Sequence, residues 1–228
     1  MTTPADQAGR DCPLCPRLVA YRQANRLAQA AWHNAPVPSF GGLEGQLLVV
    51  GLAPGVRGAN RTGRPFTGDF AGMLLYRTLL KFGLAAGAYG ADAGDGLSLV
   101  GCRVTNAVRC VPPGNLPVPA EVNACNPFLT REIAAMDRLR VILALGGVAH
   151  KAVLRALSEP GSEQKVSAGN HQRLRASQIP FTHGALHALP NGLVLADSYH
   201  VSRLNTNTGR LTEAMFESVI SDIINRLR

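Results

Sequence analysis

Short apolar runs alternate along the chain with longer stretches in which apolar residues recur every three or four positions. The short runs are rich in Leu and β-branched residues and are bounded by glycine or polar residues, which is typical of strands buried on both faces of a parallel sheet. They occupy residues 46–51, 100–108, 140–146 and 193–199. This pattern predicts four strands.

The longer stretches have the periodicity of amphipathic helices. We expect helices over residues 16–30, 70–83, 119–136, 147–157 and 212–227. The last helix is the clearest, because its apolar residues share one face: Met215, Phe216, Val219, Ile220, Ile223, Ile224 and Leu227. Thr212 precedes that helix as a candidate N-cap.

This alternation of strands and helices predicts the fold class. Parallel strands joined by crossover helices form a sheet that is covered on both faces. We therefore expect an α/β protein, a three-layer α/β/α sandwich with a central, mainly parallel four-stranded sheet. Residues 85–98 and 158–178 are expected to be surface excursions. Ligands of such sheets bind beyond the carboxyl ends of the strands, so the residues that follow each strand are the functional candidates.

The composition fits a globular protein. The chain has 228 residues, of which 46% are hydrophobic, and a mean hydropathy of +0.06. These values exclude a disordered or collagen-like protein. We expect a single domain over residues 1–228, in which residues 1–40 form an arm. No leader segment or run of about 18 apolar residues is present, so we expect a cytoplasmic protein without membrane contact.

The charge balance is strongly basic. Lys and Arg number 23 against 15 Asp and Glu, which gives a net charge of +8 and a pI near 9.8. A polyanionic partner such as nucleic acid would suit this balance. Only three of the basic residues are lysines, and arginine favours bidentate contacts with phosphate. A GC-rich genome would produce the same arginine bias, so both explanations remain open.

Five cysteines in a chain without an export signal favour thiolate chemistry over disulfides. Cys12 and Cys15 form a C-P-L-C pair, whereas fourteen residues separate Cys110 from Cys125. Zinc ribbons usually combine two C-x-x-C pairs, but an iron–sulfur cluster accepts any spacing that the fold brings together. Iron–sulfur, zinc and unligated thiols all remain possible from the spacing. Cys102 lies inside an apolar run and is expected in the core.

The segment after the first strand, residues 51–69, is dense in glycine and arginine. Glycine lets a backbone approach a ligand closely, arginine suits phosphate, and Phe66 offers a face for stacking on a planar base. The alternative is a mobile loop in which Asp69 only caps the next helix. Neither a Walker sequence nor G-x-G-x-x-G follows the first strand, which disfavours a nucleotide-cofactor enzyme.

Polar residues also follow two other strands. Asn106 could read the edge of a pyrimidine, because an amide donates and accepts at once, or it could satisfy loop backbone groups. His200 could donate to an oxygen on which negative charge develops, or it could be structural. Residues 203–210 suit either an apolar wedge with phosphate contacts or a solvated loop. Three other histidines lack partners at metal-ligand spacing, which disfavours zinc: His150, His183 and His187.

Together these motifs resemble the family 5, or type B, uracil-DNA glycosylases. The resemblance is carried by the four spaced cysteines and by G-L-A-P-G at 51–55, G-A-N-R-T-G-R-P-F-T-G-D at 58–69, T-N-A-V-R-C at 105–110 and S-Y-H-V-S-R-L-N-T-N-T-G-R-L-T at 198–212. It implies a uracil-DNA glycosylase-like fold and a monofunctional enzyme acting on double-stranded DNA. Such an enzyme flips out a deaminated base, here uracil and also hypoxanthine or other deaminated purines, and hydrolyses its N-glycosidic bond to leave an abasic site.

The resemblance also implies binding residues. A [4Fe-4S] cluster with a structural role would be held by Cys12, Cys15, Cys110 and Cys125. Phe66 would stack on the flipped base and Asn106 would read its edge, in a pocket that includes Ala53 and Gly55. The gap left in the duplex would be filled by Ser202, Arg203, Leu204 and Asn205, and phosphates would be contacted by Arg57, Arg61, Arg64, Arg203 and Arg210.

For catalysis, the resemblance implies that His200 stabilises negative charge on the departing base. Related families carry a polar residue in the first motif to position water, but residues 51–55 have only apolar side chains here. Asp69 is then the nearest acid that could orient water or stabilise an oxocarbenium-like sugar, with assistance from Asn60. No lysine lies in these motifs, so we expect no Schiff-base lyase step.

Two other functions remain open from the sequence. One is an iron–sulfur, redox-sensing DNA-binding protein without base-excision activity. The other is a zinc-stabilised protein that binds nucleotides with the glycine-rich loop. We expect a monomer, because a search along DNA for damage requires no symmetry. The sequence identifies no protein partner.

Overall fold

The computed structural model describes residues 7–158 and 178–228. The expected excursion at 158–178 therefore lies almost entirely outside the described residues. Within them, no helix combines the length and apolar character that crossing a membrane requires.

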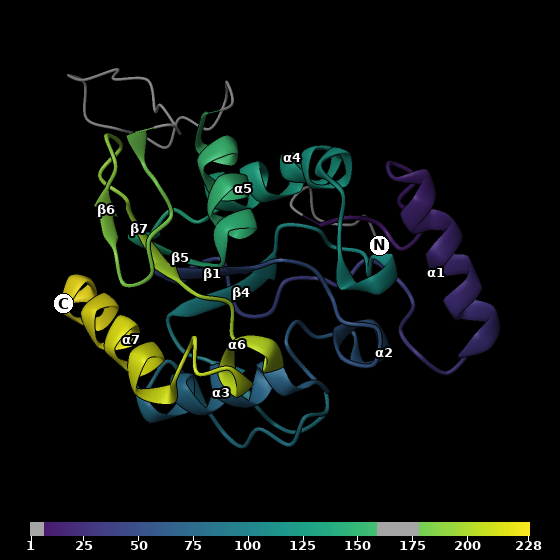
Figure 1. The fold of residues 1–228 in the computed structure, drawn as a ribbon, viewed down its shortest axis with the longest axis horizontal. Coiled ribbons are helices and arrows are strands. Elements are labelled where there is room, and N and C mark those ends of the chain that lie inside the picture. The colour runs from purple at the N-terminus through teal and green to yellow at the C-terminus, as the bar shows by residue number, and fades with distance from the viewer. Residues whose placement is uncertain (1–6, 159–177) are drawn as a thin grey trace.

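The centre of the structure is a five-stranded sheet in the order β4-β1-β5-β7-β6. β1 (Leu47–Gly51), β4 (Cys102–Asn106), β5 (Val141–Leu145) and β7 (Val194–Ser198) are parallel to their neighbours in this group. Gly51 pairs with Asn106, so the carboxyl ends of β1 and β4 are level. The four predicted strands and the mainly parallel α/β/α architecture are confirmed (Figure 1).

The sheet has one strand more than predicted. β6 (Leu186–Ala188) pairs antiparallel with β7 at the edge of the sheet. It has only three residues, and none of them is fully buried. A strand of three residues, with a histidine between Leu186 and Ala188, lacks the continuous apolar run that predicted the other four.

Two pairs of helices cover the two faces of the sheet (Figure 1). α3 (Phe70–Lys81) and α7 (Glu213–Leu227) pack on the face that carries Val49, whereas α4 (Pro119–Ala135) and α5 (Gly147–Ser158) pack on the face that carries Val50. Successive strand residues point to opposite faces, so each strand contributes to both cores. The predicted helices are all present, within a few residues of the expected ends.

The helix starts follow ordinary capping chemistry. The Thr212 hydroxyl accepts a hydrogen bond from the Met215 N–H at 3.2 Å and caps α7, as predicted. Asp69 caps α3 in the same way through the Gly72 N–H. α1 (Pro16–Ala28) lies to one side of the sandwich (Figure 1), where Leu18 packs against Val108 and Cys125. It brings the N-terminal residues next to the segment that follows β4.

Short elements fill the segments that were expected to be loops. α2 (Ala59–Thr62) and α6 (Arg203–Asn207) each form about one helical turn, and a 3₁₀ turn spans Pro113–Asn115. β2 (Ala85–Ala86) and β3 (Ser98–Leu99) form a small hairpin. Residues 85–98 are therefore not simply an excursion over the surface, because Ala85 and Leu97 are buried in the core.

Candidate functional site

A pocket lies beyond the carboxyl ends of β1, β4 and β7, where ligands of parallel sheets bind. We call it the carboxyl-edge pocket. It encloses about 250 Å³ of empty space, including its open mouth, and is lined by Ala53, Pro54, Gly55, Ala59, Phe66, Asp69, Ala71, Asn106 and His200. Six of the residues singled out in the sequence therefore meet here, from four separate motifs.

Phe66 forms one wall of the pocket in a conformation that the fold must enforce. Its φ is +52°, in the left-handed region that residues other than glycine rarely adopt. Its ring lies 6.1 Å from the His200 ring, centre to centre, with 33° between the planes. A Cβ on Gly51 would lie 2.3 Å from the Phe66 ring and 2.4 Å from Asn106 Oδ1. Glycine at this position is thus what allows the ring and the amide to meet above the end of β1.

Asn106 presents an unpaired polar group to the pocket. The residue is 3% exposed, and its Oδ1 atom has no hydrogen-bond partner among the described residues. A buried polar atom without a partner costs about 1–3 kcal/mol, so such atoms usually serve a ligand or a water molecule. This finding argues against the alternative in which Asn106 satisfies loop backbone groups.

His200 is held as a neutral imidazole. Burial lowers its pKa to about 4, because the apolar surroundings disfavour the charged form. The backbone carbonyl of His200 accepts a hydrogen bond from Asn205 Nδ2 at 2.8 Å, which ties it to α6. A neutral imidazole in this place can donate one N–H into the pocket without bringing a full positive charge.

Asp69 has two roles at once. Oδ1 caps α3, whereas Oδ2 faces Gly55 and Gly58, where a Cβ would lie 2.9 Å and 2.2 Å away. Burial raises the pKa of Asp69, an effect that the N–H groups of Gly72 and Ala71 partly offset. Capping therefore uses only one of the two carboxylate oxygens, since Oδ2 remains at the pocket.

Asn60 is placed differently from the other candidate catalytic residues. It does not line the pocket, and its Nδ2 donates to Asn34 Oδ1 at 2.9 Å. The Asn34 N–H in turn donates to the Asn60 carbonyl at 3.1 Å. These bonds connect α2 to the segment after α1, so the structure gives Asn60 a bracing contact, and its catalytic role stays a prediction.

α6 carries the predicted wedge. The Ser202 hydroxyl caps this helix through the Asn205 N–H at 3.4 Å. Leu204 is 72% exposed, so this helix presents an apolar side chain to the solvent. At the start of this helix, the Arg203 guanidinium lies 5.4 Å from the centre of the Phe70 ring, and after its end that of Arg210 lies 4.5 Å from the centre of the Tyr199 ring.

The predicted phosphate-binding arginines divide into two groups. Arg57 and Arg61 are exposed, and Arg61 Nε donates to the Arg57 carbonyl at 2.9 Å. Arg64 is 5% exposed and forms two hydrogen bonds of 2.7–2.8 Å with the carboxylate of Asp95. This placement contradicts the phosphate contact predicted for Arg64. Its partner is 31 residues away in the sequence, so no local pattern could reveal the pair.

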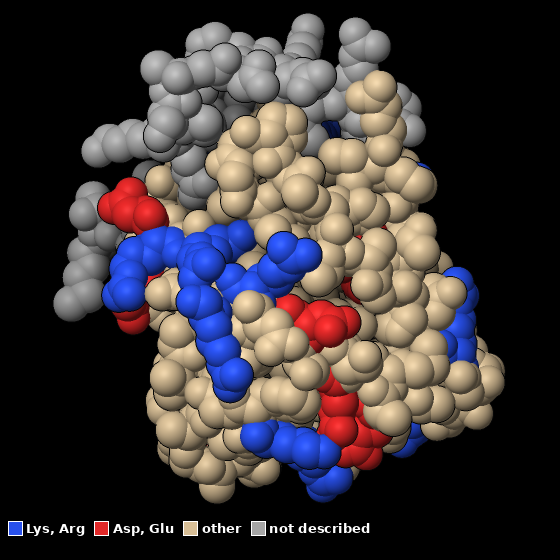
Figure 2. Space-filling view, turned by 90° about the vertical axis from the view of Figure 1, so that its left-hand side faces the viewer, with Lys and Arg blue, Asp and Glu red and all other residues tan. Residues whose placement is uncertain are grey.

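Other arginines are also internal, so the net charge overstates the basic surface. Arg103 and Arg109 are buried and share the carboxylate of Glu132. On the side of the molecule viewed in Figure 2, Lys and Arg side chains gather in separate groups with acidic side chains beside them. The positive charge of this face is therefore interrupted rather than continuous.

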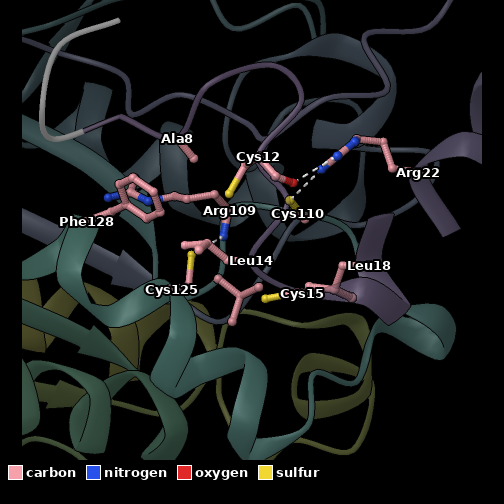
Figure 3. A pocket seen from close by; sticks show the side chains of 11 residues that line it. Ala8, Cys12, Leu14, Cys15, Leu18, Arg22, Arg109, Cys110, Cys125 and Phe128 are labelled. Carbon is pink, nitrogen blue, oxygen red and sulfur yellow. Dashed lines mark hydrogen bonds between the residues drawn. The ribbon is translucent and has the colours of Figure 1, made fainter. Parts of the chain in front are cut away.

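The four spaced cysteines line a second pocket, which we call the cysteine pocket. Cys12 and Cys15 come from the segment before and at the start of α1, Cys110 follows β4, and Cys125 lies on α4. Figure 3 shows their side chains gathered around one space with Arg22 reaching in from α1. Cys102 is apart from them, with its thiol donating to the Leu84 carbonyl at 3.1 Å. The expectation that it is a core residue is confirmed.

Hydrogen-bond donors point at the sulfur atoms. Arg22 Nη1 donates to Cys110 Sγ at 3.5 Å, and the Arg109 N–H donates to Cys125 Sγ at 3.3 Å. Arg22 Nε and Arg109 Nε are buried without a partner among the described residues. Burial raises the pKa of Cys15 to about 11 and that of Cys110 to about 12. The thiols of Cys15 and Cys110 would thus ionise near neutral pH only if a positively charged group entered the pocket.

A third polar cluster was not expected from the sequence. Asp197 lies between His150 Nδ1, at 2.7 Å, and His187 Nε2, at 3.0 Å. The prediction that His150 and His187 lack a carboxylate partner at metal-ligand spacing is therefore wrong, because the buried Asp197, inside the apolar run of β7, lies beside both. His150 Nε2 donates to the Ile179 carbonyl at 2.8 Å. Hydrogen bonds account for the contacts of this cluster.

Comparisons with known proteins agree on one family. The sequence pattern of the uracil DNA glycosylase superfamily matches residues 38–224. A type-5 uracil-DNA glycosylase of Thermus thermophilus is 44% identical over 216 residues, covering 92% of this chain and 91% of that protein. Proteins of the same name from Mycobacterium leprae and Pyrobaculum aerophilum are 42% and 37% identical, each over 92% of this chain and over 89% and 86% of their own lengths.

Proposed function

The chain belongs to the uracil DNA glycosylase superfamily, and on that premise we propose that it excises uracil from double-stranded DNA by hydrolysing the N-glycosidic bond. A base that is stacked in a duplex cannot be reached, so the nucleotide has to rotate out into a pocket. The carboxyl-edge pocket supports this proposal, because a planar wall, an unpaired amide and a neutral imidazole face one space.

The single observation that carries the proposal is the unpaired oxygen of Asn106. A uracil edge offers both a donor N–H and acceptor oxygens, and an amide can pair with both kinds of atom. Cytosine presents an amino donor where uracil has an oxygen, so the same amide would meet the wrong partner. A site that is built to pair buried polar groups rejects a ligand that leaves them unpaired.

Phe66 and His200 supply the remaining contacts with the base. The Phe66 ring offers a stacking face, and its closeness to His200 puts the imidazole near the rim of a stacked base. When the glycosidic bond breaks, its electron pair goes to the base, which becomes an anion. An N–H from neutral His200 stabilises the charge on a carbonyl oxygen of that anion.

Asp69 is proposed to act at the sugar. As the bond breaks, the sugar gains oxocarbenium character, and a carboxylate nearby stabilises the positive charge or orients the attacking water. Oδ2 is the oxygen for this role, because Oδ1 caps α3. Asn60, which braces α2, is proposed to assist by fixing the loop. The motif at 51–55 supplies no polar side chain.

Contacts with the duplex are proposed for the exposed side chains around the pocket. Leu204 would enter the space left by the flipped nucleotide, held in place by the capped turn of Ser202, Arg203 and Asn205. Arg61, Arg203 and Arg210 would meet phosphates, which makes binding weaken as salt rises. We also propose that hypoxanthine and other deaminated purines are accepted.

The cysteine pocket fits a [4Fe-4S] cluster. Four sulfur ligands, buried N–H donors without partners and a buried guanidinium suit a group that is negatively charged overall. When bound, the cluster would brace the chain by joining the N-terminal segment to α4 and to the end of β4. We give it no part in the hydrolysis.

The test incubates the purified protein with duplexes that carry one uracil or one hypoxanthine, followed by alkali to cleave abasic sites. Strand cleavage at the lesion is the expected result. Asp69→Asn serves as the matched variant, because it keeps the side-chain shape and should bind the lesion but turn over slowly. No cleavage by a protein with full iron content and intact DNA binding would contradict the proposed function.

A further inference from the structure

The turn that carries Phe66 is held from one side by two tyrosine hydroxyls. Tyr76 donates to the Pro65 carbonyl at 2.6 Å, and Tyr89 donates to the Phe66 carbonyl at 3.1 Å. The backbone of α3 approaches the same carbonyl so closely that a Cβ on Gly72 would lie 1.7 Å from it. The peptide after Phe66 is thus fixed between a helix and the hydroxyl of Tyr89.

An internal ion pair joins this turn to residues 89–97. Arg64 Nε donates to Thr67 Oγ1 at 2.8 Å, and its two other nitrogens bond to Asp95 at 2.7–2.8 Å. Both side chains of the ion pair are 6% exposed. The Asp95 carboxylate also accepts the N–H groups of Gly90 and Leu97, at 2.8 and 3.0 Å, and so closes its own loop.

Aromatic contacts complete this arrangement. The Arg64 guanidinium lies 5.1 Å from the centre of the Phe40 ring and 5.7 Å from that of Tyr76. The rings of Tyr76 and Tyr89 are 4.9 Å apart, centre to centre. The guanidinium is therefore desolvated on its faces and paired at its edge, an arrangement that has one low-energy position.

We propose that residues 89–97 are a positioning segment for the base-stacking ring, in which Tyr89 and Asp95 fix the orientation of Phe66 over the carboxyl-edge pocket. The proposal rests on the proposed function, since it assigns these residues to the same site. Neither residue lines the pocket, so both act through Phe66. The left-handed φ of Phe66 gives the reason that positioning is needed, because a phenylalanine left to itself would leave that conformation.

The proposal predicts that the segment affects the base and not the rest of the duplex. A misplaced Phe66 ring would lower the population of the flipped, stacked base, which slows excision. Contacts with phosphates and with the gap in the duplex would be unchanged. Affinity for a duplex that contains an abasic site, which has no base to stack, should therefore stay constant.

The experiment compares Tyr89→Phe with Asp95→Asn. Tyr89→Phe removes one hydroxyl and leaves the ring, so we expect single-turnover uracil excision to slow by about three- to tenfold. Asp95→Asn leaves Arg64 buried without its anion, so its excision should slow further. Tyr21→Phe, the same substitution on α1, is the matched control and should excise uracil at the unaltered rate. Affinity for the abasic duplex is measured for every variant.

The results of these measurements decide whether residues 89–97 position Phe66. Excision by Tyr89→Phe at the unaltered rate overturns the proposal, and so does a loss of abasic-duplex affinity equal to the loss in rate, which would indicate a general structural role. If Asp95→Asn fails to fold, the result for Tyr89→Phe decides alone. Excision by Phe66→Ala at the unaltered rate would instead overturn the stacking role in the proposed function.

Discussion

The carboxyl-edge pocket and the cysteine pocket share one segment of the chain, from Asn106 to Cys110, yet the polar atoms that line them have different partners. Asn106 at the end of β4 keeps an oxygen unpaired in the first pocket. Cys110, in the second, receives a hydrogen bond from a buried arginine. The first pocket leaves an acceptor oxygen unpaired, whereas the second aims donors at sulfur atoms of the chain itself and keeps two further donors, Arg22 Nε and Arg109 Nε, without a partner among the described residues.

This difference indicates whether a pocket contributes to the recognition of a ligand or to the stability of the fold. A buried polar group that is unpaired until a ligand binds lowers the free energy of unfolding and contributes to recognition of the ligand. A group that bonds within the chain contributes to the fold. Substitution of Asn106 should therefore change activity without lowering stability, whereas substitutions in the cysteine pocket should change metal retention and stability together.

The largest effect is expected for Asn106→Ala. We expect uracil excision to fall by about 10²- to 10³-fold, the scale on which preorganised donors contribute. The free energy of unfolding should stay level or rise, because a buried oxygen without a partner is removed. Excision kinetics and chemical denaturation measure the two quantities. A protein that loses stability in proportion to activity would break the comparison.

The pH dependence of the excision rate tests the carboxyl-edge pocket next. Burial raises the pKa of Asp69 and lowers that of His200 to about 4. Excision needs ionised Asp69 and neutral His200, so the rate should be level near neutral pH, fall by about tenfold per pH unit once the first group is protonated, and fall by about a hundredfold per unit below both pKa values. Asp69→Asn should lack the part of this fall that Asp69 causes. Fading of the iron–sulfur absorption in step with the rate would instead place the acid limb in the cysteine pocket.

The free energy of unfolding should also depend on pH, because His200 binds its proton at a different pH in the folded and unfolded states. The unfolded chain binds a proton at His200 near pH 6.5, whereas the folded chain does so only near pH 4. Between these values the unfolded state holds more protons, so stability falls as pH falls from 6.5 toward 4 and is level above that range. Denaturation of His200→Gln should show a weaker dependence in this window.

Arg22→Gln tests the cysteine pocket. It removes the buried charge that donates to Cys110 Sγ and to the Cys12 carbonyl. Outer-shell partners of metal ligands typically change affinity by about tenfold or more, so we expect iron to be lost about tenfold faster to a chelator. Arg26→Gln, on the same helix but bonded to the exposed Asp11, is the control. Unaltered iron loss in both variants would mean that Arg22 does not support the cluster.

The smallest effect is expected on the surface. Arg61→Gln removes one exposed charge beside the carboxyl-edge pocket, so affinity for DNA should fall only about twofold, with a salt dependence shallower by about one phosphate contact. Lys81→Gln, at the far end of α3, should leave that slope unchanged. An equal effect of the two variants would show that overall charge, not position, governs binding.

Much of the fold could be predicted because the strands are buried on both faces. Such strands are continuous apolar runs, and the crossover helices between them have a clear apolar stripe. β6 was missed because its residues are only partly buried, and it is held by pairing with β7 rather than by its own apolar character. Its existence depends on a contact that no local pattern contains.

The site residues that could be predicted are those whose role depends on their position relative to a strand or loop and not on a distant partner. Position itself indicates function for Asn106 at the end of β4, for His200 after β7 and for Phe66 in a glycine-rich loop. The prediction for Arg64 was wrong and the cluster around Asp197 was not predicted, because each of the two pairs with a residue far along the chain, Asp95 and His150 respectively. A charged residue in a sequence is read as exposed, and only the fold brings the partner that permits burial.

The segment before β1 has a consequence for aggregation. β4 is an edge strand of the sheet, and a free edge invites pairing with another chain. Phe40 covers this edge with two backbone hydrogen bonds to Val104, of 2.8 and 2.9 Å, and the Val37 N–H donates to the Arg109 carbonyl at 2.8 Å. Loss of residues 1–40 would expose the backbone N–H and C=O groups at the free edge of β4. A chain shortened in this way should therefore aggregate through this edge.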